Sequence, residues 1–182
     1  MTFGLIRDFA DLRRFPLDGY ESGTSYRVSR REEAGRTAIE LEPYRRERPF
    51  VKSWEPFEED RGRFESIVAE GNSYFLLEGD APVGLFLLER YEWNNCLNIE
   101  LIEVVRGRRG RGCGGLMLER IFRIAAALGV RAVRLEAQAT NGDAIGFYRR
   151  HGYAIEGIDL SLYSNADLES QEVAVILKRM LP

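Results

Sequence analysis

A glycine- and arginine-rich stretch between residues 104 and 117 constrains this chain more than any other segment. It reads Val-Val-Arg-Gly-Arg-Arg-Gly-Arg-Gly-Cys-Gly-Gly-Leu-Met, between an apolar run typical of a strand, 97–105, and a periodic pattern typical of a helix, 116–128. Glycine allows tight turns and the close approach of a ligand to the main chain. Successive N–H groups in such a turn, and those at the start of the following helix, attract anions. The segment therefore predicts a strand–turn–helix cradle for phosphate.

The spacing of the glycines decides between several kinds of cradle. A P-loop requires Gly-x-x-x-x-Gly-Lys followed by Ser or Thr, and this stretch has no lysine or hydroxyl residue. The dinucleotide fingerprint Gly-x-Gly-x-x-Gly fails because the gap from Gly107 to Gly110 is wrong. A repetitive, disordered RNA-binding loop is disfavoured because the segment lies between two well-patterned elements. The spacing that remains is Arg109-x-x-Gly112-x-Gly114.

The composition is that of an ordinary globular domain. The chain has 182 residues, of which 45% are hydrophobic and 30% charged, which is enough for one domain with a core. A net charge of −3 provides no global basic field, so we expect neither nucleic acid nor a membrane as a partner. No apolar run approaches membrane-spanning length, and the N-terminus lacks a signal-peptide pattern.

The few cysteines and histidines indicate in which cellular compartment the protein works and which metal sites it can form. The two cysteines, Cys96 and Cys113, lie beside a strand and at a helix start, so a mutual disulfide is not expected and a reducing cytoplasm fits. His151 is the only histidine, which makes a metal site built from several histidines improbable. We expect no metal.

The N-terminal third is less regular than the rest. Residues 1–21 show no clear element, and strands are predicted at 23–29 and 37–41 with a turn at 33–35. Three prolines, Pro43, Pro49 and Pro56, indicate an irregular connection before a helix at 57–69, whose first turn is acidic.

The remaining two thirds alternate strands with helices. We predict a hairpin from strands 73–77 and 83–90 with its turn at 78–82. A turn at Asn94 and Asn95 then precedes the strand, cradle and helix described above. The last predicted elements are a strand at 130–137, a helix from the N-cap Asn141 to Arg150, and closing strands at 157–162 and 172–180. The fold class is α/β with a mostly antiparallel sheet.

Two blocks carry a family resemblance. Arg109-x-x-Gly112-x-Gly114 resembles the acetyl-CoA pyrophosphate loop of the GNAT (Gcn5-related) N-acetyltransferases. The segment Asn-Gly-Asp-Ala-Ile-Gly-Phe-Tyr-Arg-Arg-His-Gly-Tyr, 141–153, is similar to that family's Asn-x-x-Ala-x-x-Phe-Tyr-x-x-x-Gly-Phe block. The resemblance covers about residues 74–181. It implies a GNAT-like central sheet flanked by helices, with acetyl-CoA as cosubstrate.

A narrower resemblance extends over most of the chain. Short blocks at 49–54, 93–100 and 158–165 are similar to the streptothricin acetyltransferase subgroup. This resemblance implies a single N-acetyltransferase domain over 1–182, with an acceptor-side part at about 1–70 and an acetyl-CoA-binding core at about 71–182. The implied reaction moves an acetyl group to a primary amine of a small cationic antibiotic of the streptothricin type, a form of antibiotic resistance.

The resemblance also assigns cofactor contacts. The main chain of Ile102 to Val104 would pair with the pantetheine arm like an added strand, and an N–H near Val104 would meet the thioester oxygen. Asn141 would contact the cofactor as well as cap its helix. The complete set of expected cofactor-binding residues is Ile102, Val104, Arg109, Gly110, Arg111, Gly112, Gly114, Gly115, Asn141 and Tyr148.

Two residues are the candidates for proton transfer. Tyr148 matches the family's acid position, and a phenol is neutral at pH 7 and can donate a proton to sulfur. Glu100 is assigned as the base or the amine anchor because its apolar neighbours would raise its pKa by partial burial. Each has a simpler reading, in which Tyr148 packs its helix and Glu100 is an exposed strand carboxylate.

The acceptor would be recognised by acidic and aromatic side chains. Glu58, Glu59 and Asp60 are further acidic candidates, although charge at a helix N-terminus explains at least two of them. Aromatic rings would stack on a cationic acceptor. The residues expected to bind the substrate are Trp54, Trp93, Glu103, Asp159 and Tyr163.

Three alternatives stay open at this point. The acceptor could be a protein lysine, a protein N-terminus or a polyamine, the chain could be a non-catalytic acyl-CoA sensor, or the arginine loop could bind RNA. The sequence also leaves a homodimer open.

Overall fold

The computed structural model describes residues 1–54 and 57–181, and the chain forms two compact units. Unit 1 comprises Met1–Gly19, Ser53–Arg134 and Met180–Pro182, and unit 2 comprises Tyr20–Lys52 and Leu135–Arg179. Each unit takes residues from both sides of position 70. The division into an acceptor-side part at about 1–70 and an acetyl-CoA-binding core at about 71–182 is a functional one and stays a prediction.

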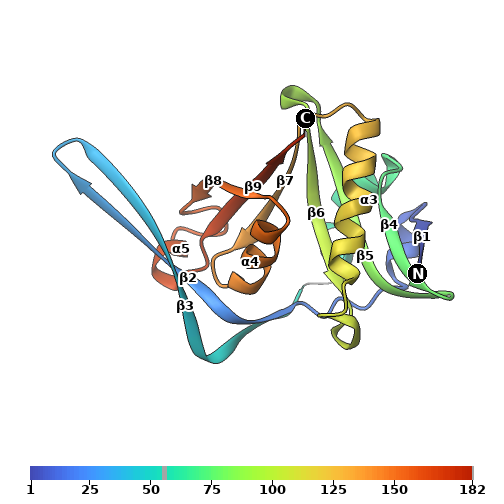
Figure 1. Ribbon diagram of the computed structural model, residues 1–182, viewed down its shortest axis with the longest axis horizontal. Helices are drawn as coiled ribbons and strands as arrows, with labels where there is room; N and C mark the ends of the chain where they lie inside the picture. Colours follow the sequence, from blue (N-terminus) through green and yellow to red (C-terminus); the bar gives the residue numbers. More distant parts are fainter. Residues whose placement is uncertain (55–56, 182) are drawn as a thin grey trace. The chain divides into compact units, whose positions relative to one another are not determined.

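The elements are distributed over the two units as follows (Figure 1). Unit 1 holds β1 (Thr2–Leu5), α1 (Phe9–Leu12), η1 (Phe57–Asp60), α2 (Arg61–Ala69), β4 (Tyr74–Glu78), β5 (Ala81–Tyr91), η2 (Glu92–Asn94), β6 (Cys96–Val104), η3 (Arg106–Arg108) and α3 (Cys113–Ala127). Unit 2 holds β2 (Tyr20–Glu33), β3 (Arg36–Lys52), α4 (Gly142–Arg150), β8 (Ala154–Asp159), α5 (Asp167–Ser170) and β9 (Ala174–Met180), whose last residue belongs to unit 1. Strand β7 (Ala132–Gln138) runs from unit 1 into unit 2.

The main sheet follows the strand order β1-β4-β5-β6-β7-β9-β8. The pairs β1–β4, β4–β5, β5–β6 and β8–β9 are antiparallel. Strands β2 and β3 form a separate antiparallel ribbon. The predicted fold class, an α/β chain with a mostly antiparallel sheet flanked by helices, is confirmed.

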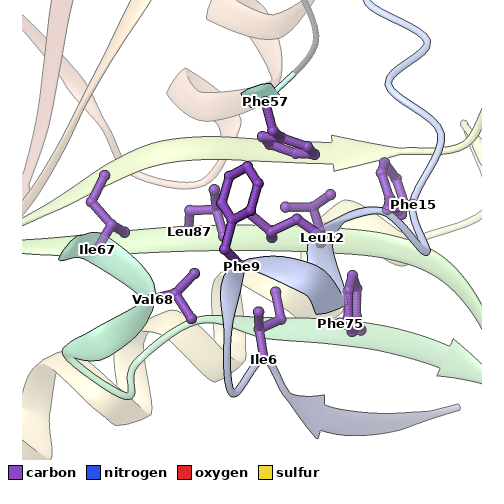
Figure 2. Close-up of a cluster of buried hydrophobic side chains, with 10 residues drawn as sticks. Ile6, Phe9, Leu12, Phe15, Phe57, Ile67, Val68, Phe75 and Leu87 are labelled. Carbon is purple, nitrogen blue, oxygen red and sulfur yellow. The ribbon is translucent and has the colours of Figure 1, made fainter. Parts of the chain in front are cut away.

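The core of unit 1 is built partly from the segment in which the sequence showed no element. Ile6, Phe9, Leu12 and Phe15 are buried there (Figure 2), so the description of residues 1–21 as irregular was wrong. Strand β1 and helix α1 have four residues each, too few for a periodic signal, and tertiary burial holds them in place. The buried residues that complete this cluster are Phe57, Ile67, Val68, Phe75, Leu85 and Leu87.

Helix α3 packs on β5 and β6 in the same unit. The apolar stripe predicted for it is buried at Met117, Ile121 and Ala125. The helix begins at Cys113, three residues before the predicted start at 116, and it therefore includes Gly114 and Gly115. The burial of its apolar face outweighs the low helix propensity of these two glycines.

The ribbon of β2 and β3 is much longer than the predicted strands at 23–29 and 37–41. The turn is where the sequence indicated it, since Ala34 and Gly35 have φ values of 47° and 79°. However, β3 continues through Pro43 and Pro49, so the expected irregular connection was wrong. In a two-stranded ribbon every strand has an open edge, where proline's missing N–H costs no ladder hydrogen bond. Pro56 lies outside the described residues.

Most other predicted elements are present with shifted ends. The helix at 57–69 is confirmed as η1 followed by α2, and the first hairpin is confirmed with a turn of only Gly79 and Asp80. The closing strands lie at 154–159 and 174–180, and the short helix α5 between them was not predicted. None of the described helices is long and apolar enough to cross a membrane.

In unit 2 a glycine allows α4 to approach the ribbon. A Cβ built on Gly142, the first residue of α4, would lie only 2.6 Å from the carbonyl oxygen of Thr24 in β2. At Gly146, one turn further along the same helix, a Cβ would meet only the flexible end of Arg150 at 3.4 Å. Gly142 therefore sets the contact distance between helix and ribbon, whereas Gly146 does not.

We predict that Gly142→Ala lowers the free energy of unfolding by about 1–3 kcal/mol, because the new methyl group collides with main chain that cannot rotate away. The matched control is Gly146→Ala in the same helix, which should be neutral or stabilise by up to about 1 kcal/mol through helix propensity. Urea denaturation followed by circular dichroism measures both. Equal stability of the two variants would contradict the close approach.

Candidate functional site

The predicted strand–turn–helix segment is present in unit 1, between the end of β6 and the start of α3. Gly110 and Gly112 have φ values of 73° and 84°, in the left-handed region that favours glycine. The first helical hydrogen bond of α3 runs from the N–H of Leu116 to the carbonyl of Gly112 at 3.2 Å. The N–H groups of residues 113–115 consequently have no acceptor within the helix. Three aligned donors at the positive end of a fifteen-residue helix can hold a phosphate group.

The four arginines of the loop have different surroundings. Arg108 forms an ion pair with Glu78 on β4. Arg109 folds back on the protein, donating from Nε to the carbonyl of Val104 at 2.8 Å and from Nη2 to the carbonyl of Gly19 at 2.7 Å. Arg106 and Arg111 are exposed and have no ion pair within the described part of the chain. The exposed pair can meet an incoming anion, while Arg109 holds the loop in shape.

Glu103 contacts both Arg109 and the segment that leads into β2. We call Glu103, Arg109, Asp18 and Gly19 together the Glu103 corner. Its Oε1 atom accepts hydrogen bonds from the N–H of Asp18 at 2.8 Å and from Arg109 Nη2 at 3.3 Å. The Asp18 carboxylate in turn accepts from the N–H of Arg106 at 3.0 Å. The other oxygen, Oε2, is buried and has no partner with normal hydrogen-bond geometry among the described residues. The carboxylate is therefore held in place through Oε1, and the indole of Trp54 is a further polar neighbour of the group.

The burial of Glu103 follows from strand alternation. Leu101 and Val105 pack against the apolar cluster of unit 1, and Glu103 stands between them at the same two-residue spacing. Burial raises the pKa of Glu103 to about 7, even though the Asp18 N–H, Arg109 and the indole of Trp54 each lower it. A carboxyl group that titrates near neutral pH can accept a proton from a substrate.

Glu100 has a different environment. The pairing of β5 with β6 shifts register so that Leu87 faces Leu101 and Leu88 faces Ile99, which leaves Glu100 as an extra residue in a β-bulge. Its Oε2 accepts from Arg63 at 2.7 Å and from Asn98 at 3.1 Å. Burial raises the pKa of Glu100, Arg63 opposes the rise, and the nearby carboxylates of Glu89 and Asp60 add to it. Arg63 forms ion pairs with both Glu100 and Glu89, and the surroundings of Glu100 are acidic.

The other residues expected in unit 1 lie in several places. Ile102 and Val104 are half-buried on β6, and Trp54 is near Glu103. Trp93, 86% exposed, precedes β6, so the length of that strand, about 25 Å, separates it from the cradle. Glu58 forms an ion pair with Arg13 at the surface. Unit 1 thus brings Glu103, Val104, Arg109 and the loop glycines together and leaves Trp93 apart.

In unit 2, the expected residues Asn141 and Tyr148 belong to α4. Asn141 is the N-cap, with its side-chain oxygen accepting from the N–H of Ala144 at 3.3 Å, as the sequence indicated. The Tyr148 ring is buried against Phe147 and Tyr153, with ring centroids 5.3 and 5.6 Å away. Burial, with a smaller contribution from Glu136, raises the pKa of the Tyr148 phenol. The hydroxyl therefore stays protonated at neutral pH.

The last two expected residues, Asp159 and Tyr163, lie at and after the end of β8. The Asp159 carboxylate accepts from the N–H of Ser161 at 3.0 Å and so shapes its own turn. The Tyr163 hydroxyl donates to Glu136, and the Lys52 ammonium lies 5.8 Å from the centre of its ring. Burial and Glu136 raise the pKa of Tyr163.

Sequence reasoning missed the residues that complete these clusters. Asp18 and Gly19 contribute to the Glu103 corner from more than eighty positions away, and Arg63 reaches Glu100 from α2. Glu136, on β7, supports Tyr163. None of them belongs to a motif, so only an explicit fold could have found them.

The family model for the acetyltransferase (GNAT) family matches residues 37–153, which is more than half of the chain and includes both the cradle and α4. This chain belongs to the GNAT acetyltransferase family. The match extends over the two blocks on which the resemblance was first based.

Individual relatives agree with this family. A streptothricin acetyltransferase of Streptomyces lavendulae is 33% identical over 104 residues, covering 57% of this chain and 55% of the relative. The chain thus spans about half the length of this curated relative. The crystal structure of nourseothricin acetyltransferase superposes with a TM-score of 0.78 at 23% identity, covering 100% of this chain and 98% of that one.

A second solved structure comes from Bacillus anthracis str. Ames and is described as a candidate streptothricin acetyltransferase in complex with acetyl coenzyme A. It has a TM-score of 0.73 at 23% identity and covers 99% of both chains. At these identities the structural likeness shows the shared fold. The GNAT fold expected from the sequence is therefore confirmed.

Proposed function

We propose that this protein is an acetyl-CoA-dependent N-acetyltransferase that acts on a primary amine of a small cationic acceptor of the streptothricin type. The observation that carries this proposal is the cradle, with its two left-handed glycines and three N–H groups that have no acceptor within α3, in a chain of the GNAT family. The names of the relatives support the acceptor class.

The residues of the cradle fit the chemistry of a pyrophosphate. The free N–H groups of residues 113–115 and the exposed side chains of Arg106 and Arg111 would hold its negative charge. Arg109 would act as a support for the loop through its own carbonyl contacts. When bound, acetyl-CoA supplies the acetyl group as an activated thioester.

The base that we propose is Glu103, with Glu100 as the anchor for the cationic amine. The burial of Glu103 and its pKa of about 7 support this role. The carboxylate of Glu100 already accepts from Arg63 and Asn98, and the acidic groups around it favour holding a cation over removing its proton. The amine would lose its proton to Glu103 Oε2 and attack as the neutral form.

The proton donor that we propose is Tyr148. The support comes from its place in the Phe-Tyr block of α4 and from burial, which keeps the phenol protonated. The amine gives up two protons in all. The first passes to Glu103 before the attack and is later released to solvent. The second leaves the nitrogen as the amide forms and replaces the proton that Tyr148 gives to the departing sulfur, so Tyr148 ends as it began. The N–H near Val104 remains the proposed donor to the thioester oxygen.

The first prediction tests the cradle. Gly112→Asp places a side chain at a φ of 84° and a negative charge before the free N–H groups, so binding of acetyl-CoA should be lost in calorimetric titration. The matched control is Gly62→Asp in α2, where a Cβ meets nothing within 4 Å, and this variant should bind normally. A folded Gly112→Asp variant with unchanged affinity would remove the basis of the proposal.

The second prediction tests the acid. Tyr148→Phe keeps the ring and removes the proton, so turnover should fall on the order of 10²-fold while acetyl-CoA affinity hardly changes. Tyr153→Phe removes a neighbouring buried phenol and serves as the control, with turnover expected to stay within a few-fold. Normal turnover in Tyr148→Phe would mean that this residue only packs its helix.

The third prediction concerns pH. Glu103 accepts a proton only when ionised, so activity should rise as pH increases through about 7, the pKa of Glu103, and the neutral fraction of the amine adds a further rise above it. Glu103→Gln should remove the rise near 7 and lower turnover by about 10²-fold. Glu100→Gln should keep that rise and mainly increase KM for the most cationic acceptors.

The opposite pattern, with the rise lost in Glu100→Gln and kept in Glu103→Gln, would reverse the two assignments. Thiol release measured with a panel of streptothricin, polyamines, lysine peptides and N-terminal peptides identifies the acceptor. Binding of acetyl-CoA without thiol release on any amine would instead make the chain an acyl-CoA sensor.

A further inference from the structure

The ribbon of β2 and β3 continues well beyond the part of unit 2 on which it packs (Figure 1). Its inner end is tied to the unit. The Tyr26 N–H donates to the carbonyl of Ala139 at 2.7 Å, and the Gln171 side chain bonds both the N–H and the carbonyl of Val28. Gln171 thereby occupies the edge of β2 as a short strand would. All residues from 29 to 40 are exposed, and we call this segment the arm.

The arm has two unlike faces. The register pairs Tyr26 with Pro43, Val28 with Leu41 and Arg30 with Ile39, and directly opposed residues share a face. An apolar stripe therefore runs outward through Pro43 and Leu41 to Ile39, which is 40% exposed. The opposite face carries the pairs Arg27–Glu42, Ser29–Glu40 and Arg31–Ala38. A two-stranded ribbon is marginally stable alone, so an exposed apolar stripe on it calls for a cover.

The inner end of the same stripe forms one wall of a hollow in unit 2. Tyr26, Leu41 and Pro43 line one side, and Arg149, Tyr153, Ala154 and Ile155, from the end of α4 and from β8, line the rest. The volume of the hollow, about 570 Å³, is enough for several side chains. From Leu41 to Gly35 the arm extends six residues, or about 20 Å, beyond this hollow. The stripe thus joins a projecting apolar side chain to a recess of mixed polar and apolar lining on one surface.

The charges on the arm and beside the hollow favour a second copy of this chain as the occupant of the hollow. The arm carries Arg30, Arg31 and Arg36 against Glu32, Glu33 and Glu40, so two arms do not repel each other. Glu32 faces the same side as Ile39, because its partner across the ribbon is Thr37. Glu32 forms an ion pair with Arg30 on that face, and Arg149 at the hollow is opposite in charge to Glu32. A surface that contains both a protruding group and the recess that fits it is self-complementary, as a two-fold dimer requires.

We propose that the arm joins two copies of this chain into a two-fold dimer, in which Ile39 of each copy enters the hollow lined by Leu41, Pro43 and Ala154 of the other. Glu32 of the inserted arm, which pairs with its own Arg30, then also meets Arg149 at the rim of that hollow. The two apolar stripes cover each other, and the charged faces of both arms remain in solvent. This surface is distinct from the cradle, so the proposal is independent of whether the chain transfers acetyl groups.

Light scattering coupled to size exclusion on the full chain tests the proposal. The expected mass is twice the 20.8 kDa of one chain. Ile39→Glu places a charge in the stripe and should reduce the mass to that of one chain. Ala38→Glu, one residue away on the opposite face and equally exposed, should leave the double mass unchanged. A single-chain mass for the unaltered protein, or a dimer insensitive to Ile39→Glu, would overturn the proposal.

A covalent test distinguishes exchange between copies from contact within one chain. Both native cysteines are buried, so the double variant Ile39→Cys with Ala154→Cys offers the accessible thiols. Mild oxidation should give a species of twice the chain mass on a non-reducing gel. An oxidised product that keeps the mass of one chain would show a bond within the chain and would contradict the exchange.

Discussion

The ion pair between buried Glu103 and half-buried Arg109 is the interaction on which the shape of the proposed cofactor site depends. Arg109 joins the carbonyls of Val104 and Gly19, and Glu103 receives the N–H of Asp18. These contacts connect the last residue of β6 to the segment that leads into β2 and to the first residues of the glycine loop. A buried carboxylate is costly without partners, so its hydrogen bonds favour one arrangement of this corner. The glycine-rich loop of the cradle therefore has a defined shape, although glycine by itself allows many backbone conformations.

The same corner explains why two neighbouring carboxylates differ. Glu103 stands on the face of β6 that packs against the apolar cluster, and its pKa rises to about 7. Glu100 occupies a bulge and faces Arg63, Asn98 and two other acids. One strand therefore presents a group suited to accept a proton and a group suited to attract a cation. Environments that separate two carboxylates in this way are the usual basis for different roles in acid–base chemistry.

The long ribbon of unit 2 raises a separate question of stability. Its inner half is covered by α4, by Ala139 and by the side chain of Gln171. The outer half has open edges and an exposed apolar stripe. Proteins usually protect such edges from uncontrolled pairing. Association of two copies resolves this within a single surface, because the stripe supplies both the inserted side chain and the wall of the recess.

The sequence by itself determined the family, the order of the main elements and the location of the cradle. Each of these depends on residues close together along the chain, such as the glycines from 110 to 115 and the block from Asn141 to Gly152, and local patterns record such features directly. The helix start at Cys113 and the strands through Pro43 and Pro49 were misjudged, because burial and open edges outweighed local propensity.

Only the tertiary structure decided the environment of each carboxylate and the extent of the ribbon. Asp18, Arg63 and Arg109 approach the acids of β6 from separate segments, and a one-residue bulge changes which face a side chain occupies. A pKa depends on desolvation and on charges that are near in space, and the spacing of residues along a chain does not contain these distances. For that reason the sequence identified both Glu100 and Glu103 as candidates, and only the fold showed that their environments differ.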